Sequence, residues 1–195
     1  MSGELNGKQI AVLATDGVEQ VELERPWQTL EEAGAEPELV SLGGGTITMY
    51  QHIDKGDQKQ VDTTVASADP EDYAALVLPG GVINGDFVRA DADAVAFVKA
   101  FFDAGKPVAA ICHAPWVLAE ADVVRGRRMT SWPSLQTDLR NAGAKWVDEE
   151  VVVDGNLVTS RNPDDLDAFG AAIVERFASA AEGAEDAEEE TADAR

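Results

Sequence analysis

Three short apolar runs, each ended by a turn motif, constrain the fold of this chain more than any other feature. They occupy residues 8–14, 74–78 and 107–111. Near-continuous apolar runs of this length are typical of parallel strands that are buried on both faces. Segments with helical spacing of apolar residues lie between them, such as 21–33 and 94–102. This order predicts a doubly wound α/β sandwich, in which ligands bind beyond the carboxyl ends of the strands.

The length of the chain favours one folded domain with flanking segments. A chain of 195 residues, 45% of them hydrophobic, is long enough for one substantial core and too short for two. We expect an N-terminal extension over residues 1–7, a single domain over 8–180 and a disordered acidic tail over 181–195. The tail is predicted from its composition, since acidic residues dominate it.

The net charge of the chain restricts its partners. It holds 37 acidic and 15 basic residues, which gives a formal charge of −22. Nucleic-acid binding requires basic clusters that neutralise phosphates, and the sequence has none, so we expect no nucleic-acid partner. Repulsion between so many acidic groups is relieved by salt. The acidic, lysine-poor composition therefore resembles that of a cytoplasmic protein from a halophile.

The sequence also predicts the compartment. Residues 1–7 lack a basic segment followed by a long apolar one, and no stretch approaches the roughly 20 apolar residues that a membrane span needs. We therefore expect a soluble, cytoplasmic protein without a membrane partner. The single cysteine, Cys112, excludes an intrachain disulfide framework and indicates a reducing environment.

Cys112 is the first candidate functional residue. It ends the apolar run 107–111, and His113 and Pro115 follow it. Because proline suits the first turn of a helix, the thiol is predicted to lie on a strand-to-helix elbow, as the serine of Gly-x-Ser-x-Gly hydrolases does. Unpaired N–H groups and partial positive charge at a helix start favour the thiolate. We predict a nucleophile; the alternative is a packing role, because free cysteines are often buried.

Two further motifs are predicted to meet Cys112 at the same edge of the sheet. Residues 16–19 follow the first strand, and residues 79–81, Pro-Gly-Gly, follow a middle strand. Carboxyl ends of parallel strands share one edge, so loops that follow them lie together. The sequence therefore places a candidate active site at this edge.

Eight segments occur in an order and spacing that point to one family. They are Val18–Leu23, Ala75–Gly81, Lys106–Pro115, Arg125–Arg127, Thr130–Pro133, Asn141–Val147, Val151–Asn156 and Thr159–Arg161. Taken together, they resemble the motifs of the PfpI family, within the ThiJ/PfpI superfamily, over about residues 8–178. The resemblance implies a flavodoxin-like three-layer sandwich with a mostly parallel sheet, which associates into dimers or hexamers and needs no cofactor. It implies intracellular cysteine peptidase, glyoxalase or deglycase activity, the last on methylglyoxal-derived adducts.

The resemblance also implies roles for individual residues. Cys112 would be the nucleophile, and Glu19 the carboxyl group that meets its sulfur. Since a carboxylate beside a thiolate is unfavourable, Glu19 is expected to be protonated and to donate a hydrogen bond to the sulfur. His113 would be the base, or would only shape the elbow. The backbone N–H groups of Gly81 and His113 are the expected oxyanion donors.

Two further residues, Asp86 and His52, each have two alternative roles. Asp86 stands where hexameric members place a glutamate that completes the site of a neighbouring subunit; the alternative is a helix N-cap. His52 has no second histidine or cysteine near it in the sequence. A loop or interface role is therefore favoured over metal binding, and we expect no metal.

Two function classes follow. The first is a cysteine-dependent hydrolase that acts on reactive carbonyl compounds, glycated adducts or peptides. The second is a non-catalytic redox or stress-response protein with an oxidisable cysteine. Glutamine amidotransferases share the elbow but need a downstream His-x-Glu pair, and no histidine follows His113, so that class is excluded.

Overall fold

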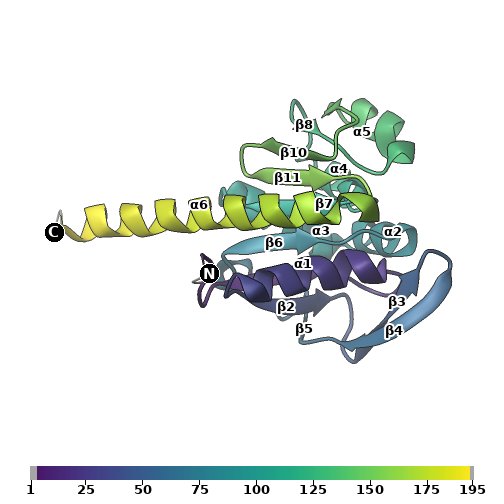
Figure 1. Cartoon of the computed structure of the whole chain (residues 1–195), viewed down its shortest axis with the longest axis horizontal. Coiled ribbons are helices and arrows are strands. Elements are labelled where there is room, and N and C mark those ends of the chain that lie inside the picture. Colours follow the sequence, from purple (N-terminus) through teal and green to yellow (C-terminus); the bar gives the residue numbers. More distant parts are fainter. Residues whose placement is uncertain (1–3, 194–195) are drawn as a thin grey trace.

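A seven-stranded sheet forms the middle layer of the molecule (Figure 1). The computed structural model describes residues 4–193, without the side chains of residue 182 and residues 184–193. Neighbouring strands pair in parallel except for the antiparallel edge pair β10–β11. The sheet order is β10 (Val151–Asp154), β11 (Leu157–Ser160), β7 (Val108–Ile111), β6 (Ala75–Leu78), β1 (Gln9–Leu13), β2 (Glu36–Ser41) and β5 (Thr63–Thr64).

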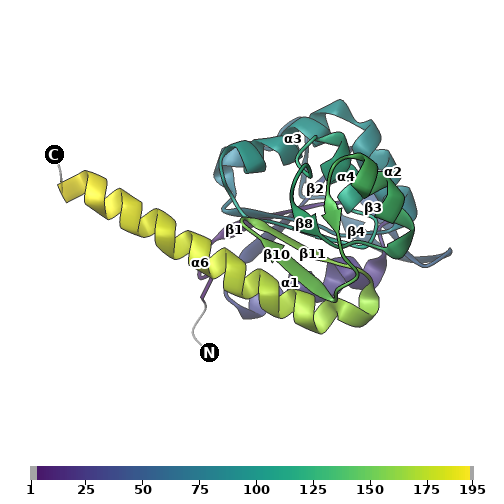
Figure 2. The ribbon, with the colours of Figure 1, turned by 90° about the horizontal axis from the view of Figure 1, so that it is seen from above.

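Helices cover both faces of this sheet, which confirms the predicted three-layer α/β sandwich (Figure 2). Alternate residues of β1 belong to opposite cores: Ile10 packs with α1 and α6, whereas Ala11 packs with α3 and α4. This explains the near-continuous apolar run of the strand. The helices are α1 (Gln20–Glu32), α2 (Val82–Ala90), α3 (Ala92–Asp103), α4 (Pro115–Glu120), α5 (Gln136–Asn141) and α6 (Leu166–Asp193).

Two short pairs of strands stand apart from the main sheet. The antiparallel hairpin of β3 (Thr46–Gln51) and β4 (Asp54–Gln60) projects beyond the same end of the sheet as α2 (Figure 1). The parallel pair β8 (Arg128–Met129) and β9 (Lys145–Trp146) forms the third sheet. Single-turn helices occur at Pro70–Asp72, Pro133–Leu135 and Pro163–Asp165.

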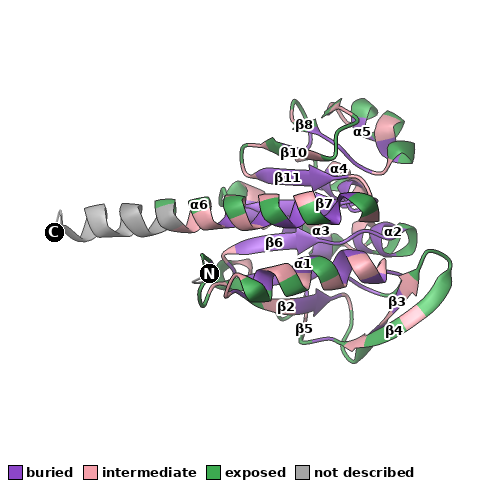
Figure 3. Ribbon diagram, in the orientation of Figure 1, coloured by how far each residue is buried: buried purple, intermediate pink, exposed green. Residues whose placement is uncertain are grey.

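Burial follows the layers (Figure 3). The central strands β6 and β7 are buried along their whole length, whereas β4 is mostly exposed. Leu5, within the predicted N-terminal extension, is buried and its N–H donates to the carbonyl of Ala33 at 3.0 Å. Residues 1–3 lie outside the described residues.

The backbone of α6 continues as helix through residues 181–193, the segment that we expected to be disordered. Alanine and glutamate, its main constituents, are strong helix formers, so the acidic composition does not break the helix. The side chains of residues 184–195 lie outside the described residues, and the expected domain boundary at residue 180 stays a prediction. No helix among the described residues is both long and apolar enough to cross a membrane.

Candidate active site

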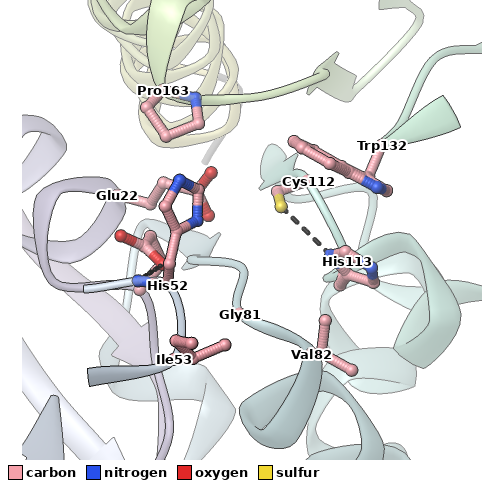
Figure 4. Close-up of a pocket in the computed structure, with 10 residues that line it drawn as sticks. Glu22, His52, Ile53, Gly81, Val82, Cys112, His113, Trp132 and Pro163 are labelled. Carbon is pink, nitrogen blue, oxygen red and sulfur yellow. Dashed lines mark hydrogen bonds between the residues drawn. The ribbon is translucent and has the colours of Figure 1, made fainter. Parts of the chain in front are cut away.

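A pocket of about 300 Å³ opens at the carboxyl ends of β1, β6 and β7 (Figure 4). The motifs after these three strands contribute to it, as the sequence predicted. The hairpin tip between β3 and β4 also reaches it from the side. The pocket is lined by Glu19, Glu22, His52, Ile53, Gly81, Val82, Cys112, His113, Trp132 and Pro163.

Cys112 occupies a strained elbow. Its φ of 63° lies in the left-handed region, which residues with a side chain rarely adopt. The backbone is held there from both sides, since the N–H of Cys112 donates to Ser160 O at 3.1 Å and its carbonyl accepts from Trp132 N–H at 2.8 Å. The predicted elbow is therefore present, and it directs the sulfur into the pocket (Figure 4).

His113 faces the sulfur of the residue before it. Its Nδ1 lies 3.1 Å from Cys112 Sγ. The ring stacks on Trp132 with centroids 5.6 Å apart and meets Trp116 edge to face at 5.3 Å. Burial lowers the pKa of His113 to about 4, so the imidazole is neutral at pH 7 and can accept the thiol proton. The unusual φ of Cys112 makes this contact between adjacent residues accessible.

The carboxyl group that meets the sulfur is that of Glu22, so the expectation for Glu19 is wrong. Glu22 is fully buried beside Cys112 and its carboxyl interacts with the thiol, although neither carboxyl oxygen has a partner in ordinary hydrogen-bond geometry among the described residues. It lies in the first turn of α1, one turn before Pro26, on the helix face that packs against the sheet. Glu19 precedes the helix in extended backbone, and its Oε2 accepts a hydrogen bond from His52 N–H at 3.0 Å.

Burial sets the protonation state of Glu22. It raises the pKa of this carboxyl to about 8, and the nearby charge of Glu19 adds to the effect. The adjacent thiol of Cys112 and the backbone of Gly80 act in the opposite direction. Glu22 is therefore protonated at neutral pH and can donate a hydrogen bond to the sulfur. The protonated carboxyl predicted beside the thiol exists, three residues further along the chain.

The pKa of the Cys112 thiol is shifted in the direction opposite to the one expected. Burial, and then the charge of an ionised Glu22, raise the pKa of Cys112, although the N–H groups of Gly81 and His113 lower it. The lowered pKa predicted from a helix start is thus wrong in direction. The helix α4 has only six residues and Cys112 is 6% exposed, so desolvation dominates. A thiolate forms with least cost while Glu22 keeps its proton.

Glycines leave room for these contacts. A Cβ on Gly80 would lie 2.5 Å from Cys112 Cβ and would also strike the Glu22 carboxyl, so only glycine fits between them. Gly81 has a φ of 94°, and its N–H bonds to the sulfur. The two predicted oxyanion donors, the N–H groups of Gly81 and His113, therefore both face Cys112 Sγ.

Asp86 does not line the pocket of its own chain. It lies within α2, where its Oδ1 accepts a hydrogen bond from Arg89 Nε at 3.1 Å. The N-cap alternative is wrong, because Asp91 caps the following helix by accepting from Ala94 N–H at 2.9 Å. Its predicted role in a neighbouring subunit stays a prediction.

His52 lies in the predicted loop, but its place in the pocket was missed by sequence reasoning (Figure 4). Trp132 and Pro163 were missed as well. Among the described residues, no group of three or more His, Cys, Asp or Glu side chains could hold a metal ion. The sequence did contain an indication of Glu22. It lies four and eight residues before Pro26 and Leu30, on the same apolar face of the helix, and this spacing indicates a buried carboxyl.

A family model described as "DJ-1/PfpI family" matches residues 8–176. This chain belongs to the DJ-1/PfpI family. "Putative cysteine protease YraA" of Bacillus subtilis is 43% identical over 83% of the chain and 94% of that protein. "Deglycase PH1704" of Pyrococcus horikoshii is 45% identical, with the same coverage of both chains.

Solved structures of DJ-1/PfpI proteins agree with this fold. DJ-1beta of Drosophila melanogaster has a TM-score of 0.80 and 30% identity, over 91% of this chain and 97% of that one. A two-domain protein of Anabaena variabilis, with DJ-1/ThiJ/PfpI-like and ferritin-like domains, has a TM-score of 0.82 and 37% identity. The present chain covers 48% of that longer protein, and the match covers 87% of the present chain.

Proposed function

We propose that this DJ-1/PfpI protein is a cysteine-dependent hydrolase that removes 2-oxoaldehyde adducts, such as those of methylglyoxal, from amines. The observation that carries the proposal is the placement of Cys112 Sγ between two proton-transfer groups, the neutral Glu22 carboxyl and His113 Nδ1, in an open pocket. Relatives named deglycases at 44% and 45% identity support it.

Nucleophilic attack begins the proposed reaction. His113 Nδ1 accepts the thiol proton, and the sulfur bonds to the adduct carbon that carries the nitrogen. The C–N bond breaks, and the amine leaves with the proton of Glu22. A hydroxyketone then remains on the sulfur, held at the N–H groups of Gly81 and His113.

Hydrolysis completes the proposed reaction. The Glu22 carboxylate moves a proton from the sulfur-bearing carbon to the neighbouring ketone carbon, and the hydroxyl proton passes to the ketone oxygen, which converts the hydroxyketone into a thioester of a 2-hydroxy acid. Water attacks the thioester, and the N–H groups of Gly81 and His113 stabilise the oxyanion. The Glu22 carboxylate takes the proton that the attacking water loses, and the thiol leaves with the proton held by His113, so both groups return to their starting states. The sum is adduct plus water giving amine plus 2-hydroxy acid.

Methylglyoxal-modified N-acetylarginine tests this proposal. We expect the wild type to release N-acetylarginine and lactate in equal amounts, and Cys112→Ala to release neither above the spontaneous rate. A scavenger of free methylglyoxal separates the alternatives: release that stops with the scavenger indicates a glyoxalase. Consumption of free methylglyoxal and hydrolysis of a peptide are measured in parallel. A wild type that matches Cys112→Ala on all three substrates overturns the hydrolase.

The alternative is a redox protein without turnover. The side chain of Cys112 is nearly buried yet lines an open pocket, so a small oxidant can reach it while larger thiols are kept away. In that case peroxide would add oxygen to Cys112 in a wild type that is inactive in all three assays.

The proposal includes self-association, with Asp86 acting at the site of a second copy. Three apolar side chains of α2 are exposed around it, namely those of Val82, Ile83 and Phe87. Exposed apolar patches of this kind mark interfaces. We expect the wild type to sediment as a dimer or hexamer and Phe87→Glu to shift toward monomer. An active monomeric wild type contradicts a role for Asp86 in another subunit.

A further inference from the structure

The tip of the β3–β4 hairpin forms the pocket wall opposite Cys112. His52 and Ile53 occupy the tip and line the pocket, although they are sixty residues from the elbow in sequence (Figure 4). The imidazole of His52 makes no hydrogen bond within the described part of the chain. A polar side chain that lines a pocket without an internal partner is available to a bound ligand.

The backbone of His52 is held in a strained conformation. Its φ is 60°, in the left-handed region. The carboxylate of Glu19 accepts the His52 N–H at 3.0 Å and fixes the residue in this conformation. Strain of this kind persists where the surrounding structure imposes it and is concentrated at functional sites. Glu19 therefore orients His52, whereas Glu22 serves the thiol.

The rest of the hairpin is fastened to the same loop and helix. Tyr50 N–H donates to Val18 O at 2.8 Å, and Gly17 N–H donates to Thr48 O at 2.9 Å. Further along, Gln20 bonds to Asp57 twice: its Nε2 donates to Oδ2 at 2.8 Å, and its Oε1 accepts from the backbone N–H at 3.0 Å. The tip consequently holds a fixed position relative to the segment that carries Glu22.

From this placement we infer that His52 is the substrate-selecting residue of the pocket, which hydrogen-bonds the second oxygen of a 2-oxoaldehyde adduct while the adjacent carbon is bonded to Cys112. The inference rests on the proposed function and assigns the specificity of the same site. The N–H groups of Gly81 and His113 serve the oxygen beside the sulfur. A substrate with one oxygen hydrogen-bonds only to these N–H groups, whereas a substrate with oxygens on two adjacent carbons also reaches His52 on the opposite wall.

Variants of His52 test this with two substrates. On methylglyoxal-modified N-acetylarginine, His52→Ala is expected to raise KM about tenfold with kcat changed less than threefold, which corresponds to the loss of one hydrogen bond. His52→Gln, whose amide can donate, is expected to recover most of the loss. With p-nitrophenyl acetate, whose acyl group has no second oxygen, His52→Ala should acylate Cys112 at the wild-type rate.

The outcomes separate the inference from the proposed function. A KM unchanged in His52→Ala overturns the inference alone, and so does an equal loss on both substrates, because that pattern indicates a distorted pocket. Asp54→Asn, which changes an exposed residue of the same hairpin outside the pocket lining, is the matched control and is expected to leave KM within about threefold. A wild type without turnover of the adduct overturns the proposed function and the inference together.

Discussion

Replacement of Glu22 by alanine is expected to lower kcat for the hydrolysis of methylglyoxal-modified N-acetylarginine to N-acetylarginine and lactate by about 10² to 10³-fold. A positioned proton donor contributes about this much to catalysis. Glu22 is the buried, protonated carboxyl beside the Cys112 side chain, with a pKa raised to about 8 by burial. Glu22→Gln keeps the shape and a hydrogen-bond donor but cannot transfer a proton, so it should lose nearly as much kcat. Steady-state kinetics at pH 7 measure both.

Glu19→Gln is the matched comparison, since the family resemblance pointed to that residue. Glu19 contacts the backbone of His52 and not the sulfur, so its replacement is expected to raise KM, as a loosened hairpin would, with kcat within about threefold. A loss of kcat in Glu19→Gln as large as in Glu22→Ala contradicts the assignment of Glu22, and so does a Glu22→Ala variant with wild-type kcat.

The second large effect is on stability. The free energy of unfolding of the wild type is expected to fall by about 2 kcal/mol between pH 6.5 and 8. The ordinary pKa of a glutamate is 4.5, whereas folded Glu22 titrates at about 8. Between these values the folded chain binds a proton that the unfolded chain has lost. The stabilisation that comes from the proton on Glu22 is therefore fully present below pH 4.5, the pKa in the unfolded chain. It is lost as the pH rises toward about 8, the pKa in the folded chain.

His113 limits the useful pH window. Its pKa is lowered from 6.5 to about 4 by burial, so below pH 6.5 the unfolded chain binds a proton that the folded chain does not. The contribution of His113 to the free energy of unfolding therefore rises between pH 4 and 6.5, whereas that of Glu22 falls as the pH rises. Above pH 6.5 the contribution of His113 fades as the unfolded histidine loses its remaining proton, and the effect of Glu22 dominates.

Urea unfolding at three pH values in this window, at one salt concentration, measures the effect of Glu22. Glu22→Gln places no charge in the core at any pH, so it should show no decline and should exceed the wild type in stability at pH 8. Parallel pH profiles for the two proteins would show that Glu22 does not hold a proton in the folded state.

Local pattern was sufficient to predict the fold and the elbow. The apolar runs marked strands buried on both faces, and Pro115 after Cys112 marked the helix start. These features depend on residues close in sequence, and the shared edge of parallel strands then brings Cys112 and Gly81 together.

The remainder of the site depends on tertiary packing. Glu19 and Glu22 lie in one motif, and which of them meets the sulfur depends on α1 beginning at Gln20. His52 reaches the pocket because a hairpin distant in sequence is fastened to the loop before α1. The raised pKa of Cys112 follows from burial, which outweighs the local effect of a short helix. None of these has a local signature in the residues around Cys112.

The most direct test of the account is the mass of the protein during turnover. Wild type mixed with methylglyoxal-modified N-acetylarginine and quenched in acid should carry a three-carbon acyl group that appears and decays at the rate of product release. Because Cys112 is the only cysteine, digestion assigns any thiol-bound group to it without ambiguity. The account predicts that the group lies on Cys112 and is absent from Cys112→Ala. Product release in which Cys112 is never modified would contradict it.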